Sequence, residues 1–94
     1  MKIDETDIHH HLKYRMSQRG ISKEEIENTF NKGWPADDAK EGVKGKVFVF
    51  SYNSYWEGKY YEEKEITVYY KIKEDKVIFL TAEARYGKTF IKGG

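Results

Sequence analysis

The sequence predicts a small α+β domain in which two N-terminal helices pack on an antiparallel sheet of three or four strands. Three observations support this prediction. The chain has 94 residues, which is enough for one domain with a modest hydrophobic core. Its first third has helical periodicity with distinct start and stop signals, and the remainder contains three segments rich in β-forming residues. We therefore expect a single domain over residues 1–94.

The first helix is expected from about Asp7 to Arg19. Three apolar residues recur every four positions in this segment and form one stripe, which consists of Ile8, Leu12 and Met16. Thr6 or Asp7 is suited to cap the N-terminus, and Gly20 follows the last residue, where glycine commonly ends a helix. We expect the apolar stripe to face the core.

The second helix has a more complete start signal. Ser22 and Glu25 form an S-x-x-E capping box, in which each side chain accepts a hydrogen bond from the other residue's backbone N–H. Ile21 precedes the box and can pack on Ile26 as a hydrophobic staple. Gly33 is expected to end this helix. The two helices therefore form a hairpin with a short turn.

Three strand segments follow an exposed loop over Ala36–Gly45. They are dense in β-branched and aromatic residues and consist of Lys46–Tyr52, Glu65–Ile72 and Val77–Ala84. The polar segment Lys73–Lys76 joins the last two strands as a hairpin turn. Between the first two, Glu57-Gly58 can turn a hairpin whose arms extend both strands. Successive hairpins make the sheet antiparallel.

Composition excludes several classes of protein. Aromatic residues make up 16% of the chain, whereas disordered chains are poor in them. The absence of cysteine excludes disulfide scaffolds, thiolate zinc sites and cysteine nucleophiles. No apolar run approaches the roughly 20 residues that span a bilayer, and the N-terminus lacks the apolar segment of a signal peptide. We therefore expect a cytoplasmic protein without membrane contacts.

One helical stripe contains the residue types that act on phosphodiesters. His11, Arg15 and Arg19 are spaced by four residues, so they lie in a row at the rim of the apolar face. Histidine can move a proton near neutral pH, and arginine can hold phosphate oxygens. The chain has 14 Lys but only three Arg, the third being Arg85, so an arginine marks a place that favours a planar donor. Alternatively, these groups brace the fold.

The segment from His11 to Ser22 reads H-x-x-x-R-M-x-x-R-G-I-S. This pattern resembles an uncharacterised domain family of small prokaryotic proteins that is grouped with the RelE/ParE-like toxin superfamily. The resemblance extends to the chain's strand-rich half, which ends in Leu80–Gly87. It implies a RelE-like fold, RNA cleavage without metal, free or on the ribosome, and an antitoxin protein as partner. The matching residues are His11, Arg15, Met16, Arg19, Gly20 and Ile21.

The expected catalytic site combines one titrating group with cations that neutralise a phosphate. It consists of His11, Arg15, Arg19, Arg85 and Tyr86. We expect the three arginines to converge with His11 on one concave surface. The expected RNA-binding residues are Lys64, Thr81, Tyr60 and Trp56. Lys64 is also, with Tyr86, a candidate second proton carrier, whereas Thr81 is more simply an ordinary strand residue.

Aromatic residues gather around the turn at Glu57-Gly58, and they are Tyr52, Tyr55, Trp56, Tyr60 and Tyr61. We rank packing across the hairpin first, a surface for a partner or a homodimer second, and stacking on RNA bases third. The run His9–His11 does not predict a metal site, because consecutive helical residues point about 100° apart. No phosphate-binding loop or dinucleotide fingerprint occurs, so we expect no cofactor.

Two functions of different classes follow. The first, which we favour, is a toxin-like ribonuclease that cleaves RNA by metal-independent acid–base catalysis and forms part of a toxin–antitoxin pair. The alternative is a non-catalytic binding or regulatory module of the same fold that uses its aromatic hairpin. The net charge of +1 does not by itself favour a polyanionic partner.

Overall fold

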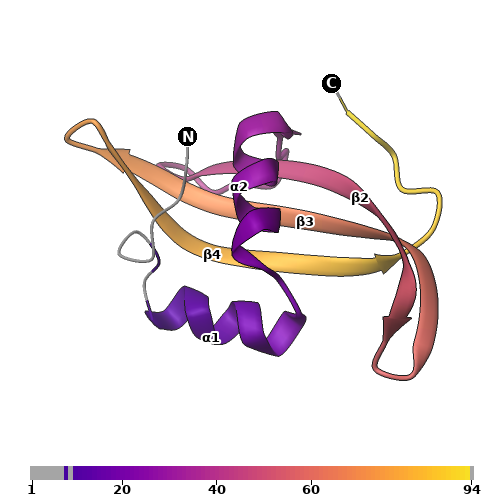
Figure 1. Ribbon diagram of the computed structural model, residues 1–94. Helices are drawn as coiled ribbons and strands as arrows, with labels where there is room; N and C mark the ends of the chain where they lie inside the picture. Colours follow the sequence, from indigo (N-terminus) through magenta and orange to yellow (C-terminus); the bar gives the residue numbers. More distant parts are fainter. Residues whose placement is uncertain (1–7, 9, 94) are drawn as a thin grey trace.

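A computed structural model describes residues 8 and 10–93 of the chain and confirms the expected fold class (Figure 1). Two helices precede a four-stranded antiparallel sheet, and the strands lie side by side in chain order. The elements are α1 (His10–Arg19), α2 (Lys23–Lys32), β1 (Trp34–Pro35), β2 (Lys44–Trp56), β3 (Lys59–Lys73) and β4 (Lys76–Gly87). Both helices cover the same face of the sheet.

Helix α1 ends as the sequence predicts. Gly20 has a φ of +69°, in the left-handed region that favours glycine, and the Ile21 N–H donates to the Met16 carbonyl at 2.8 Å. The helix begins at His10 rather than near Asp7, and the expected caps at Thr6 and Asp7 lie outside the described residues. Ile8 is nevertheless buried in the core.

The capping box at the start of α2 is present. The Glu25 N–H donates to Ser22 Oγ at 3.1 Å, and the Ser22 N–H donates to Glu25 Oε1 at 2.9 Å. Ile21 and Ile26, on either side of the box, are both buried in the same core cluster. Gly33 follows the last residue, as predicted, and its N–H donates to the Thr29 carbonyl at 2.9 Å.

The three predicted strands exist and are longer than predicted. Strands β2 and β3 extend to the turn at Glu57-Gly58, as expected for hairpin arms, and Glu74-Asp75 forms the turn between β3 and β4. All four of these turn residues have positive φ, which is typical of tight hairpins. The two-residue strand β1 pairs with β2 and makes the sheet four-stranded. Register shifts interrupt both long pairings, between Ser51 and Ser54 and between Tyr69 and Tyr70.

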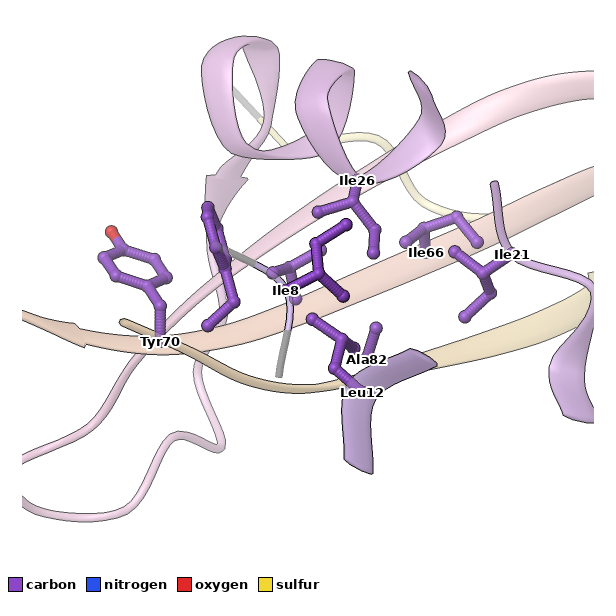
Figure 2. Packing of buried hydrophobic residues seen from close by; sticks show 9 residues of the cluster. Ile8, Leu12, Ile21, Ile26, Ile66, Tyr70 and Ala82 are labelled. Atoms are coloured by element: carbon purple, nitrogen blue, oxygen red, sulfur yellow. The ribbon is translucent and has the colours of Figure 1, made fainter. Parts of the chain in front are cut away.

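The core lies between the helices and one face of the sheet (Figure 2). Its buried members are Ile8, Leu12, Ile21, Ile26, Ile66, Val68, Tyr70, Phe79 and Ala82. Phe30 of α2 closes the cluster with edge-to-face contacts to Tyr70 and Phe79, at ring-centroid distances of 5.0 and 5.4 Å. Within the described residues, no helix is long and apolar enough to cross a membrane.

Alternation along β3 separates two faces of the sheet. Lys64, Ile66, Val68 and Tyr70 are buried beneath the helices, whereas the intervening residues point to the opposite side. We call this opposite side the open face. On β3 this face presents polar and charged side chains in place of the core cluster, and they are Glu63, Glu65, Thr67 and Tyr69.

Candidate nucleic-acid interface

Lys64 is a buried cation that braces the turn between the two helices. Only 3% of the residue is exposed. Its Nζ donates to the Gly20 carbonyl at 2.5 Å and to Glu25 Oε1 at 2.9 Å. Because Glu25 also belongs to the capping box, one carboxylate links the start of α2 to β3. Lys64 therefore lies inside the fold rather than on a surface that RNA can reach.

Tyr86 and Arg19 join the end of α1 to the edge strand β4. The Tyr86 hydroxyl donates to the Arg19 carbonyl at 2.7 Å, and the Arg19 guanidinium donates to the Ala82 carbonyl at 3.2 Å. Burial raises the pKa of the Tyr86 phenol well above its usual value, and Tyr52 and two nearby carboxylates raise it further. Tyr86 therefore keeps its proton, and that proton is already used in a hydrogen bond.

An aromatic cluster surrounds Tyr86. Trp56 stacks on the Tyr86 ring at a centroid distance of 5.0 Å and an interplanar angle of 10°. Tyr52 and Tyr61 contact the same ring at 5.3 and 5.5 Å. The Lys64 ammonium lies 5.4 Å from the ring centroids of both Tyr52 and Tyr86. These three rings pack on Tyr86 of β4, whereas the packing across the β2–β3 hairpin that we ranked first is made by Tyr55 and Tyr60, with ring centroids 5.4 Å apart.

A hollow adjoins this cluster where β4 stops and β3 continues. Its volume is about 430 Å³, and its lining residues are Lys59, Tyr60, Tyr61, Glu62, Tyr86, Gly87 and Lys88. Gly87 is the last β4 residue paired with β3, so the segment from Lys59 to Glu62 has a strand neighbour on one side only. Tyr60 remains 48% exposed, although its ring contacts that of Tyr55 across the hairpin. The hollow therefore combines aromatic rings with two exposed lysines.

Helix α1 presents a second basic surface. His11 is exposed and Arg15 is half-buried, one helical turn further on, where its guanidinium is 3.5 Å from Gln18 Oε1. The helix contains Lys13 and Arg19 as well, and no carboxylate. The three residues expected in one row, His11, Arg15 and Arg19, do lie on this helix. Arg19, however, is tied to the backbone of β4.

The expected convergence of all three arginines is wrong. Arg85 pairs in register with Glu65 and forms an ion pair with it at 3.4 Å on the open face, away from the helices. Its guanidinium also lies 5.1 Å from the centre of the Phe90 ring. Thr81 faces the same side, opposite Tyr69. Adjacent strand residues point to opposite faces, so Arg85 lies on the open face and Tyr86 on the helix side of the sheet.

Most of the chain matches a known protein family. A family model described as "Domain of unknown function (DUF4258)" matches residues 3–83. The chain belongs to this family. No curated protein and no solved structure matches the chain. The DUF4258 match covers α1, the capping box and Lys64, whereas Tyr86 and Lys88 lie beyond its last residue.

Sequence reasoning missed the two lysines of the hollow in this DUF4258 protein, Lys59 and Lys88. Each is one of 14 lysines, so its residue type carries little information. The strand pairing identifies these two lysines, because the pairing of β3 with β4 ends at Glu63 and Gly87 and leaves the hollow beside this last pair. Within the described part of the chain, no group of three or more His, Cys, Asp or Glu side chains is placed to hold a metal ion.

Proposed function

We propose that this DUF4258 protein is a non-catalytic module that binds single-stranded RNA at the hollow beside β4. The observation that carries this proposal is the lining of the hollow, in which three tyrosines occur together with two lysines. Rings stack on unpaired bases without regard to sequence, and lysine ammonium groups neutralise the phosphates between them. Among the described residues that line the hollow, Glu62 is the one carboxylate, and it disfavours a phosphate at its own position.

The proposal of a non-catalytic module is supported by the hydrogen bonds and the ion pair that the expected catalytic groups already make within the fold. Lys64 and Tyr86 use their polar atoms to hold the α1–α2 turn. Arg19 binds a β4 carbonyl, and Arg85 is on the open face. A phosphodiester beside His11 would therefore lack most of the cations that were expected around it.

The test measures fluorescence anisotropy of a labelled 12-nucleotide single-stranded RNA with the full chain. Tyr60→Ala should weaken binding about 5- to 150-fold, the equivalent of one lost stacking contact. Tyr60→Phe keeps the ring and should bind like the unchanged protein. Lys88→Ala should reduce the slope of log K against log salt by about 0.7, the value for one phosphate contact on a single strand.

Lys71→Ala is the matched control, because Lys71 is exposed at the other end of β3. It should leave both affinity and salt dependence unchanged. Equal losses in Lys88→Ala and Lys71→Ala would show that attraction is diffuse and that the hollow is not the site. Absence of RNA binding in the unchanged protein would reject the proposed function outright.

A second candidate is the toxin-like ribonuclease. It is favoured by the exposed His11 and by Arg15 one turn away on a helix without carboxylates, together with the resemblance to RelE/ParE-like toxins. Induced expression in bacteria should then arrest growth and degrade RNA, unless an antitoxin protein is supplied. His11→Ala should lower activity about 10²- to 10⁴-fold. His10→Ala, the neighbouring exposed histidine, should retain activity.

A further inference from the structure

Two adjacent hollows form a track along the open face of the sheet. The larger has a volume of about 650 Å³ and the smaller about 420 Å³. They are continuous, because Asp38, Tyr69 and Glu83 line both. The larger hollow also has apolar walls, made by Trp34, Pro35, Val47 and Ile91. Among the residues that the structure describes, none lines both the track and the hollow beside β4.

The track is more acidic than basic. Its carboxylates are Asp37, Asp38, Glu65 and Glu83, and its cations are Arg85 and Lys40. Arg85 is already paired with Glu65 at 3.4 Å, and Asp38 accepts hydrogen bonds of 3.0 and 3.1 Å from the Tyr69 hydroxyl. Within residues 8 and 10–93, Asp37 and Glu83 take part in no ion pair and both are exposed. These two charges are available to a ligand.

The end of the chain shows which chemistry this side of the sheet accepts. The Phe90 N–H donates to Glu63 Oε1 at 2.9 Å, and the Lys92 ammonium pairs with Glu63 Oε2 at 2.8 Å. This segment contains neither helix nor strand, and its residues Ile91 and Gly93 line the larger hollow. A non-helical segment that carries lysine and apolar side chains is thus already docked beside the track.

We propose that the track is a docking site for an extended, basic segment of a partner protein. Lysine or arginine side chains of that segment would pair with Asp37 and Glu83. Its apolar side chains would pack on Trp34, Pro35 and Ile91, and its backbone would follow the sheet. The charge of the track and the docked tail both favour this occupant over an acidic peptide or a nucleic acid, which Asp37 and Glu83 would repel.

The experiment uses the full chain and a fluorescein-labelled 12-residue synthetic peptide in which lysine alternates with leucine. A peptide with glutamate in place of lysine is the comparison probe. Anisotropy should rise with the lysine peptide alone. Glu83→Gln and Asp37→Asn should each weaken binding about two- to fivefold, the range for single exposed ion pairs. Asp75→Asn removes one charge at the distant β3–β4 turn and should have no effect.

Backbone NMR spectra locate the peptide. Shifts confined to the track, around Thr67, Tyr69 and Glu83, are the expected result. Equal binding by Glu83→Gln and Asp75→Asn, or shifts confined to the hollow beside β4, would overturn the proposal. Tyr60→Ala should bind the peptide normally, so failure here is distinguishable from failure of RNA binding. Self-association that Glu83→Gln abolishes without peptide would also overturn it, in favour of a second copy of the chain.

Discussion

Residues of the sequence motif explain the fold more directly than they explain chemistry. Within the motif, Gly20 permits a left-handed turn and its carbonyl accepts a hydrogen bond from Lys64, while the Arg19 carbonyl accepts one from Tyr86. The alternative that the residues of the helical stripe brace the fold is confirmed for Arg19, because its guanidinium donates to the Ala82 carbonyl of β4. The face on which Arg85 lies could not be read from the sequence, because register shifts interrupt the period-two alternation and one residue of slip reverses every side chain.

Gly20→Ala should destabilise the protein by about 2–5 kcal/mol. The left-handed φ costs a non-glycine residue about 1–2 kcal/mol. A Cβ would also lie 2.7 Å from Trp56 Cη2 and 3.0 Å from the Tyr86 hydroxyl, and such overpacking costs about 1–3 kcal/mol. Urea unfolding measures the sum.

Gly42→Ala separates these two costs. Gly42 has a φ of +82°, but a Cβ there would meet no atom within 4 Å. It should lose only about 1–2 kcal/mol of stability. Equal losses at both positions would mean that Trp56 does not pack against Gly20.

Tyr69 gives a prediction for alkaline pH. Burial and the neighbouring Asp38 raise its pKa to about 12, with smaller contributions from Glu83 and Glu65. The unfolded chain releases this proton near pH 10, so above that pH the folded state binds more protons than the unfolded state. The contribution of Tyr69 to stability is complete below pH 10 and is lost as the pH rises to about 12. Tyr69→Phe should flatten this part of the stability curve in urea unfolding at successive pH values.

Elements defined by local signals were predictable, and elements defined by distant pairing were not. The capping box, the glycine after α1 and both hairpin turns depend on residues within one or two turns of each other, and each is present. Strand β1 consists of two residues that pair with Lys46 and Val47 across a loop, and nothing in Trp34-Pro35 itself predicts a strand. The hollow beside β4 was not predictable for the same reason, since it depends on where the pairing of β3 with β4 ends.

Ser22→Ala tests the start of α2 as an element. The Ser22 Oγ accepts the Glu25 N–H, which has no partner within the helix, so the substitution should cost about 1 kcal/mol. Ser17→Ala, at an exposed position inside α1, is the matched control and should change stability by less than about 0.5 kcal/mol. An unchanged denaturation midpoint for Ser22→Ala would mean that α2 starts at another residue in solution.

At the scale of the whole molecule, a net charge of +1 conceals two surfaces of opposite character. Helix α1 contains Lys13, Arg15 and Arg19 without a carboxylate, whereas the described residues that line the track include four carboxylates and two cations. The composition alone could not show this separation, because it requires knowing which strand residues face the helices. The RNA proposed for the hollow beside β4 and the basic segment proposed for the track would bind at separate sites, because their described lining residues do not overlap.

The shared core predicts that the helices and the sheet unfold as one cooperative unit. Leu12 of α1 is fully buried in the same cluster as residues of α2, β3 and β4, so α1 cannot detach without opening that cluster. Leu12→Ala should cost about 2–5 kcal/mol. Unfolding followed by far-ultraviolet circular dichroism and by fluorescence of Trp34 and Trp56 should shift to one common lower midpoint. Tyr14→Ala, on the same helix but 63% exposed, should leave both midpoints nearly unchanged. Two separate midpoints in Leu12→Ala would show that α1, together with its basic surface, unfolds independently of the sheet.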